Sequence, residues 1–199
     1  RRYHKATYSI GLGAGRHFVR QVDLSSRRKL LDLGGGSGGY SIAAAHSLPD
    51  LTAVVFDLPP VTIMAEEYIT EHGLSDRVST QAGDFTHDPF PQDVDVVVMA
   101  SNLPQYGPEL IGQIIQKAFH ALVPGGEMHM VGEMLDNDRS GPLDAAIWGL
   151  AESLSNSTGL AHSRGDCVRY FTQAGFTEVM VHEFIPSILA RVSGTKPAI

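Results

Sequence analysis

Short, continuous apolar runs alternate along the chain with stretches in which apolar residues recur at helical spacing. Continuous runs bounded by turn residues are typical of strands buried on both faces, and helical spacing is typical of the amphipathic helices that cover them. The pattern predicts a parallel sheet between two layers of helices. Strands are expected near residues 29–33, 51–56, 77–81, 94–100, 126–133, 177–184 and 188–193, and helices near 38–47, 59–72, 108–122, 142–154 and 163–174.

The last two expected strands are separated by Pro186 and read as a hairpin, which makes the final strand antiparallel. The fold class is therefore α/β, a doubly wound, seven-stranded and mostly parallel sheet with helices on both faces. We expect residues 1–28 to form a linker and a helix, and residues 29–199 to form the main domain. Within the first segment, GLGAG at 11–15 fits either a flexible loop over a ligand or an ordinary bend.

The segment LLDLGGGSGGYS at 30–41 runs from an apolar strand straight into a loop rich in glycine. Glycine allows positive φ and leaves no Cβ, so a ligand can lie against the main chain. A tight turn needs only one or two glycines, and the helix that follows presents free N–H groups at the same edge of the sheet. These features indicate a nucleotide-cofactor site.

Asp57 ends the second strand at roughly the 20-residue offset at which an acid reaches a ribose hydroxyl. The glycines match the dinucleotide fingerprint only loosely, so the loop alone leaves dinucleotides and adenosine-type ligands open. After the next strand, Asp84 and Phe85 are expected at the same edge. There they could meet an adenine ring by hydrogen bonding and by stacking.

The ordered motifs LDLGGGSGGYS, VVFDLPPV, GDF, DVVVMASN and LVPGGEMHMVGEML resemble those of S-adenosylmethionine-dependent methyltransferases. More narrowly, the chain resembles the catalytic domain of the small-molecule O-methyltransferases that include the caffeate and acetylserotonin enzymes. The resemblance spans about residues 10–193 and implies the class I, Rossmann-like methyltransferase fold with S-adenosylmethionine as cofactor. It implies methyl transfer to a small-molecule acceptor, foremost O-methylation of a hydroxyl on an aromatic or secondary metabolite.

The resemblance also implies a set of cofactor-binding residues at the carboxyl ends of the first four strands. In this set Asp57 holds the ribose, Leu58 packs on the adenine, and Ser101 lies beside the sulfonium. Asp32 either orients the glycine loop through backbone amides or contacts the cofactor's amino group through water. The full set is Asp32, Gly34, Gly36, Asp57, Leu58, Asp84, Phe85 and Ser101.

The chain departs from the family where catalysis is expected. Many family members carry His-Asp-Trp or His-x-Tyr after the fourth strand, with the histidine as general base. Here the stretch reads SNLPQYGPE, which puts Pro104 in the place of the histidine and Gln105 next to it. Neither side chain accepts a proton at neutral pH. The candidate replacement is His162, which could instead be a loop histidine that caps the following helix.

The acceptor pocket is expected to involve residues after the fourth and fifth strands and on the next helix. Met134 and Trp148 could equally be core residues. The expected set, besides His162, is Met99, Asn102, Gln105, Tyr106, Met134 and Trp148.

Because the usual base is missing, other functions stay open. An acceptor atom that is already nucleophilic needs little more than alignment with the methyl group. The chain could therefore be a C- or S-methyltransferase, for example one that acts on a keto-acid carbon with the help of a metal. His162 with Asp136, Asp138 or Asp144 could ligate such a metal, but their spacing matches no recognised motif and no metal site is expected. A cofactor-binding module without methyl transfer is another alternative, and a nicotinamide dehydrogenase lacks a Tyr-x-x-x-Lys pair to support it.

Composition and charge limit the expected partners and location of the protein. The net charge of −7 argues against a nucleic-acid partner, and no apolar run is long enough to span a membrane. The start of the chain lacks the apolar core of a signal peptide, so a cytoplasmic location is expected. The resemblance implies that an N-terminal dimerisation domain is missing from this chain and that the full-length protein is a homodimer. Four histidines are expected at the surface: His46, His72, His87 and His182.

Overall fold

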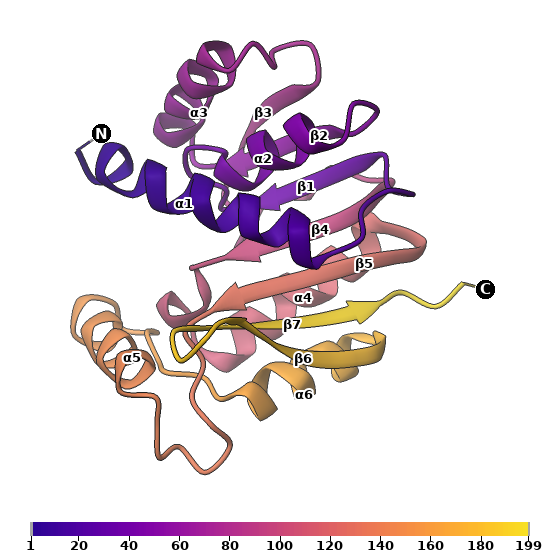
Figure 1. The fold of residues 1–199 in the computed structure, drawn as a ribbon. Coiled ribbons are helices and arrows are strands. Elements are labelled where there is room, and N and C mark those ends of the chain that lie inside the picture. The colour runs from indigo at the N-terminus through magenta and orange to yellow at the C-terminus, as the bar shows by residue number, and fades with distance from the viewer. Residues whose placement is uncertain (1, 199) are drawn as a thin grey trace. The chain divides into compact units, whose positions relative to one another are not determined.

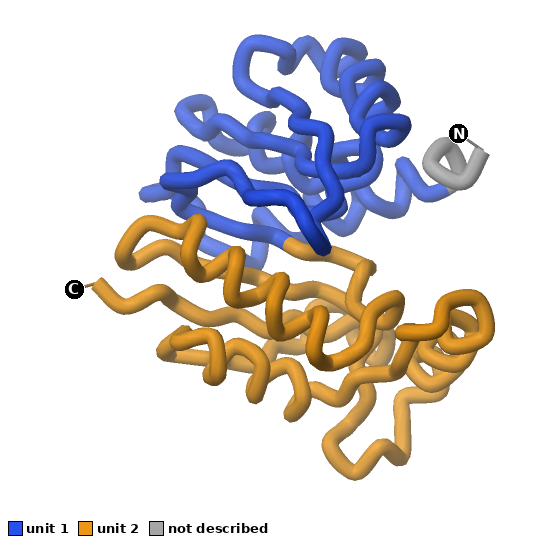
Figure 2. The backbone as a smooth tube through the Cα atoms, turned by 180° about the vertical axis from the view of Figure 1, so that it is seen from behind, with its two compact units in different colours: residues 1–98 blue, residues 99–199 orange. Residues whose placement is uncertain are grey.

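The computed structural model describes residues 2–198, and their side chains from residue 7 onward. The chain folds into two compact units, residues 1–98 and residues 99–199, which Figure 2 draws in different colours. Figure 1 labels the helices and strands of both. Within the described residues, none of the helices combines the length and the apolar character that crossing a membrane requires.

Unit 1 combines helices with parallel strands: α1 (Arg2–Gln21), β1 (Lys29–Leu33), α2 (Gly39–Ser47), β2 (Thr52–Asp57), α3 (Pro59–Glu71), β3 (Val78–Ala82) and the start of β4 (Val94–Ala100). β2 pairs in parallel with β1 and with β3. Leu33 lies opposite Phe56, and Asp57 lies opposite Ala82, so these strands end at nearly the same level. The loops that follow them therefore emerge at one edge, where ligands of this architecture bind.

The apolar runs form the strands, as predicted. Leu30, Leu31 and Leu33 of β1 have exposed fractions of 0%. Because neighbouring side chains in a strand point to opposite faces, both faces of β1 are buried. The polar exception among the buried positions of this strand is Asp32, which belongs to the candidate site.

The GLGAG segment is neither a loop nor a bend, because it lies inside α1. A Cβ on Gly39 of α2 would lie 2.6 Å from the backbone carbonyl carbon of Gly11, and a Cβ on Gly15 would lie 2.5 Å from the carbonyl oxygen of Gly39. Real Cβ atoms do not come so close to a backbone. The glycines therefore let α1 and α2 pack with their backbones in contact, which overcomes the low helix propensity of this segment.

Unit 2 holds the end of β4 and the elements that follow it: η1 (Leu103–Gln105), α4 (Pro108–Ala121), β5 (Leu122–Gly132), α5 (Leu143–Ser155), α6 (Arg164–Ala174), β6 (Thr177–Ile185) and β7 (Leu189–Thr195). β7 runs antiparallel to both β5 and β6, which confirms the predicted hairpin. The strand order of the seven-stranded sheet is β3-β2-β1-β4-β5-β7-β6. This order and the covering helices confirm the doubly wound α/β fold class.

One strand is longer than predicted. β5 begins at Leu122 rather than near residue 126. Lys196 continues the pairing beyond β7, since the Gly125 N–H donates to its carbonyl oxygen at 2.9 Å and its own N–H donates to the Gly126 carbonyl at 2.8 Å. A partner from the far end of the chain thus turns a Pro-Gly-Gly segment into strand, which local sequence does not indicate.

Candidate cofactor and acceptor sites

The glycine loop after β1 turns sharply into α2. Gly34 and Gly36 have φ of 62° and 59°, and Gly38, the N-cap of α2, has φ of 77°. Other residues are strained in this region. Gly35 is required for a different reason, because a Cβ there would lie 2.7 Å from the carboxyl carbon of Asp32. Backbone conformation and packing within unit 1 therefore fix the shape of the loop.

Asp57 ties this loop to the end of β2. Its Oδ2 accepts a hydrogen bond from the Gly36 N–H at 2.9 Å, and its Oδ1 accepts one from the Leu58 N–H at 2.7 Å. A carboxylate has about four acceptor positions, so each oxygen can also receive a ligand hydroxyl. The Leu58 side chain is 48% exposed and offers apolar surface beside the carboxylate. The structure thus brings three predicted cofactor residues together in a group that fits a ribose and the base attached to it.

Asp32 is a buried carboxyl group with 1% exposure. Its Oδ2 accepts hydrogen bonds from the Ser41 hydroxyl at 2.9 Å and from the Ser41 N–H at 3.3 Å. Burial raises the pKa of Asp32 to about 6, the Ser41 hydrogen bonds oppose this rise, and the charge of Asp57 adds to it. Asp32 therefore fixes the first turn of α2 to β1. The amide that it binds belongs to α2 and not to the glycine loop.

The segment after β3 carries Asp84 and Phe85. The Asp84 Oδ1 accepts a hydrogen bond from the Thr86 N–H at 2.9 Å, and the Asp84 N–H donates to the Asp88 carboxylate at 2.7 Å, which closes a tight turn. Phe85 is only 7% exposed. Stacking of an adenine on this ring would require its buried face to become accessible, so the adenine contacts of both residues stay predictions.

In unit 2, β4 ends in a strained turn. Ser101 has φ of 60°, which is uncommon for a residue other than glycine. Its N–H donates to the Val131 carbonyl of β5 at 2.9 Å, and the Asn102 side-chain amide donates to the Ala100 carbonyl at 2.9 Å. Strained residues of this kind cluster at binding and catalytic sites. The exposed Ser101 side chain is therefore held by backbone pairing at the carboxyl end of the strand, where the sequence predicts it.

The predicted acceptor residues differ in their surroundings. Met99 and Met134 are each 1% exposed, so they are buried core residues. Trp148 on α5 is 49% exposed, so the alternative that it is a core residue is wrong. The Gln105 carbonyl accepts a hydrogen bond from the Asn156 side-chain amide at 2.8 Å, which ties η1 to the segment after α5.

His162 has 1% exposure, and both of its ring nitrogens are engaged. Its Nε2 lies 2.8 Å from the Tyr106 carbonyl oxygen, which can only accept, so Nε2 carries the proton. Its Nδ1 then accepts from the Tyr170 hydroxyl at 3.0 Å, and burial lowers the pKa of His162. The lone pair that a general base needs is thus already occupied, and the geometry favours a structural role. The helix cap is not His162 but Ser163, whose hydroxyl accepts from the Asp166 N–H.

Sequence reasoning missed Glu133. This residue follows β5 directly, at the carboxyl end of the strand, and its side chain is half-buried. Burial raises the pKa of Glu133, and the nearby charge of Asp144 raises it further. A carboxylate with a raised pKa is a better proton acceptor near neutral pH. The available signal was a charged residue at the end of a buried apolar run.

The histidine and aspartates considered for a catalytic metal do not form a ligand set. Asp136 pairs with Arg164 at 3.4 Å, and Asp138 accepts the Ser140 N–H at 3.0 Å. Throughout the part of the chain that the structure describes, no three His, Cys, Asp or Glu side chains are grouped so as to hold a metal ion.

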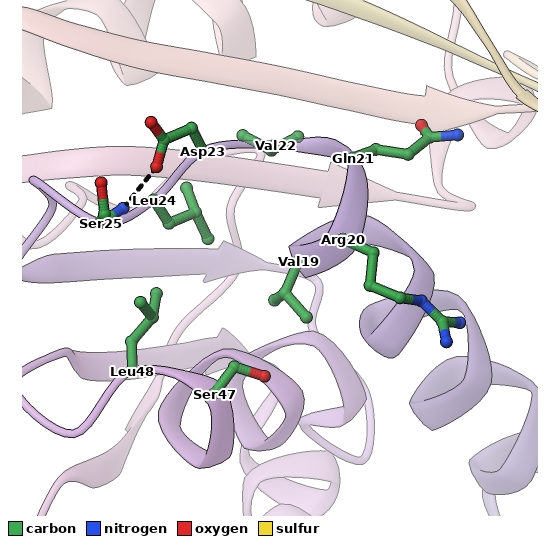
Figure 3. A pocket seen from close by; sticks show the side chains of 9 residues that line it. All are labelled: Val19, Arg20, Gln21, Val22, Asp23, Leu24, Ser25, Ser47 and Leu48. Carbon is green, nitrogen blue, oxygen red and sulfur yellow. Dashed lines mark hydrogen bonds between the residues drawn. The ribbon is translucent and has the colours of Figure 1, made fainter.

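Each unit also has a surface cavity of its own. The cavity in unit 1 has a volume of about 380 Å³ and lies where α1 and α2 end (Figure 3). The cavity in unit 2 has a volume of about 600 Å³ and lies at the start of α4. No predicted cofactor residue lines either one. The first is lined by residues 19–25, Ser47 and Leu48, and the second by residues 107–110, Gln113 and residues 157–160.

Comparison with known proteins connects these features to a family. The chain is 35% identical over 164 residues to L-tyrosine C(3)-methyltransferase of Streptomyces lavendulae, which covers 82% of this chain and 45% of that protein. It is 32% identical over 195 residues to 3-hydroxy-5-methyl-1-naphthoate 3-O-methyltransferase of Streptomyces sahachiroi. This match covers 98% of this chain and 56% of that protein. The chain thus spans about half the length of these relatives.

The structural match agrees. The crystal structure of the S-adenosylmethionine-dependent methyltransferase SibL in its apo form superposes with a TM-score of 0.81 and 31% identity, over 92% of this chain and 54% of that one. The model of the O-methyltransferase domain matches residues 3–177. The family expected from the ordered motifs is confirmed, and the chain belongs to the O-methyltransferase family.

Proposed function

We propose that this chain binds S-adenosylmethionine and forms the catalytic part of a methyltransferase that acts on a small-molecule acceptor, foremost on a hydroxyl of an aromatic or secondary metabolite. The observation that carries the proposal is the group formed by Asp57, Gly36 and Leu58. An acid that shapes the loop and keeps free acceptor positions suits a ribose whose base lies on apolar surface. The similarity to SibL, which is described as S-adenosylmethionine-dependent, supports the choice of this nucleoside.

In this proposal, the residues of the chain bind the cofactor and orient it. Asp57 accepts from the ribose hydroxyls, Leu58 supports the adenine, and Asp84 and Phe85 limit its far edge. Gly34 and Gly36 allow the methionine part to lie on the backbone, Ser101 lies beside the sulfonium, and Asp32 keeps α2 in place. Bound S-adenosylmethionine supplies an electrophilic methyl group, so the acceptor needs alignment above all.

The acceptor proton needs a destination when the methylated atom is a hydroxyl oxygen. Pro104 and Gln105 cannot take it, and the His162 lone pair is occupied by Tyr170. We assign the proton to the Glu133 carboxylate, because burial raises its pKa toward the working range of a general base. A Glu133→Gln variant of the full-length enzyme should lower kcat with little change in KM, whereas His162→Gln should lower stability first.

A second candidate function is methylation of an aromatic ring carbon. The relative named L-tyrosine C(3)-methyltransferase is 35% identical to this chain, and Pro104 leaves the usual position of the O-methylation base without an ionisable group. A pH titration of the product's ultraviolet absorbance separates the two reactions, since an O-methyl product loses its phenol titration and a C-methyl product keeps it.

Cofactor binding can be tested first, by calorimetric titration of the chain with S-adenosylhomocysteine. NAD serves as the control ligand, Asp57→Ala as the test variant, and Asp50→Ala, an exposed acid outside the site, as the matched control variant. We expect binding of S-adenosylhomocysteine that Asp57→Ala loses and Asp50→Ala keeps. Binding of NAD alone, or equal binding by both variants, would overturn the proposal.

We also propose that the full-length protein is a cytoplasmic homodimer that does not bind nucleic acid. The family resemblance supports the dimer, and the net charge of −7 supports the absence of a nucleic-acid partner. Light scattering of the full-length protein after size-exclusion chromatography tests the dimer, and a monomer at micromolar concentration would refute it.

A further inference from the structure

Two histidines and a tyrosine form a chain of contacts on the helical side of unit 1, outside the candidate cofactor site. The Nε2 of His46 lies 3.0 Å from the Nδ1 of His72, and the other ring nitrogen of His72 is hydrogen-bonded to the Tyr8 hydroxyl. Tyr8 in turn stacks on Tyr68, with ring centroids 3.8 Å apart and planes 9° from parallel. Side chains from α1, α2 and α3 therefore meet at one point.

We propose that His46 and His72 bind a divalent transition-metal ion that prefers imidazole and square-planar or tetragonal geometry, such as Cu²⁺ or Ni²⁺. Metal–imidazole bonds are about 2.0–2.1 Å long, so two nitrogens bound at roughly a right angle lie about 2.9–3.0 Å apart. The separation of 3.0 Å fits this arrangement. The ring planes are 67° apart and the rings meet edge-on, so the two rings are not stacked face to face.

The Tyr8 contact is what a metal-binding histidine requires at its other nitrogen. Histidine ligands almost always donate their second ring N–H to a nearby oxygen, which fixes the tautomer and directs the remaining lone pair at the metal. If the Nε2–H of His72 donates to the Tyr8 oxygen, the lone pair of Nδ1 points toward His46. The stacked Tyr68 ring holds Tyr8 in this position.

The ends of two helices favour a cation at this pair of histidines. His46 lies in the last turn of α2, and His72 is the C-cap of α3, so both stand at the negative ends of helix dipoles. The positive charges of Arg77 and Arg16 act on His46 and oppose this attraction. Glu71 adds a negative charge near Tyr8. With two protein ligands, the remaining positions of the metal would be filled by water.

The experiment is a calorimetric titration of the chain with Cu²⁺ and, separately, Ni²⁺ in a non-chelating buffer at neutral pH. We expect one equivalent to bind, His46→Ala to weaken that binding at least tenfold, and His120→Ala, a histidine on α4 of unit 2, to leave it unchanged. Tyr8→Phe keeps the stacked ring but removes the hydroxyl, and we expect a loss of roughly tenfold or more, as for other such hydrogen-bond partners.

Two further measurements make the result decisive. The bound Cu²⁺ should show coupling to two nitrogens in its electron paramagnetic resonance spectrum, and saturating metal should raise the melting temperature of wild type but not of His46→Ala. Equal affinity of wild type and His46→Ala, or no binding at all, would overturn the proposal and leave the two rings as a hydrogen-bonded pair. Each variant is compared with wild type by circular dichroism, so that a folding defect is not taken for loss of the site.

Discussion

Replacing Asp32 with asparagine tests how the first turn of α2 is held to β1. The variant keeps an oxygen that can accept from the Ser41 hydroxyl but removes the ionisable group. In the wild type this group is buried at 1% exposure, and burial raises its pKa from 3.8 to about 6. The folded state therefore binds the proton more tightly than the unfolded state does. The resulting stabilisation is fully present below the unfolded pKa of 3.8 and is lost as the pH rises through about 6.

The size of the effect follows from the shift. Each pKa unit corresponds to about 1.4 kcal/mol, so ionisation of Asp32 lowers the free energy of unfolding by about 3 kcal/mol over the full range. Between about pH 4.5 and about pH 7.5 the expected part of this loss is about 2 kcal/mol. The Asp32→Asn variant has no titrating group at this position. Raising the pH from about 4.5 to about 7.5 should therefore change the difference in the free energy of unfolding between variant and wild type by about 2 kcal/mol, in favour of the variant.

Urea unfolding of both proteins at the two pH values measures this difference and cancels the contributions of all other titrating groups. Ser41→Ala is the matched control, since loss of its hydroxyl bond removes a contact that favours the ionised form and should widen the pH effect. A difference between wild type and Asp32→Asn that is constant to within about 0.5 kcal/mol would show that Asp32 is not a buried acid with a raised pKa.

Two further substitutions test packing in each unit. His162→Phe should lower the free energy of unfolding by about 2–3 kcal/mol in urea melts, because it leaves the Tyr106 carbonyl and the Tyr170 hydroxyl without their buried partner. A variant as stable as wild type would refute the structural role. Gly39→Ala should destabilise by about 1–3 kcal/mol in thermal melts, because its Cβ would meet the backbone of α1. Gly11→Ala, whose Cβ meets nothing within 4 Å, should be neutral or stabilising, and equal losses in both would contradict the close packing of these helices.

The sequence predicts the bounds of a strand well where the strand is buried on both faces, because a continuous apolar run then marks its start and its end. β1 and β4 begin and end at the predicted residues, because most of their positions are apolar and buried. Prediction of secondary structure fails where a segment that is distant in sequence determines the local conformation. GLGAG reads as a loop because of its glycines, yet α2 packs against them and keeps the segment helical. Lys196 likewise extends β5 through a Pro-Gly-Gly segment that would otherwise be a turn.

The glycine loop shows how far a motif can be trusted. The number of glycines in the loop indicates a ligand only if the backbone turn and its packing require fewer glycines than the loop contains. In the structure, three glycines have positive φ, Gly35 packs against Asp32, and Gly39 packs against α1. The fold alone thus accounts for all five. What supports a nucleoside is Asp57, which was predicted from its offset and whose Oδ2 binds the loop at Gly36 while its Oδ1 binds the Leu58 N–H, so that acceptor positions remain on both oxygens.

The proposed proton acceptor shows the opposite limit. His162 was singled out by residue type and place in the family pattern, but its two nitrogens are occupied by partners that lie 56 and 8 residues away in sequence. Glu133 passed unnoticed because a carboxylate at a strand end is ordinary, and only burial distinguishes it. A base is defined by a free lone pair and a suitable pKa. Both depend on tertiary neighbours, so a proposal for the catalytic base needs the fold.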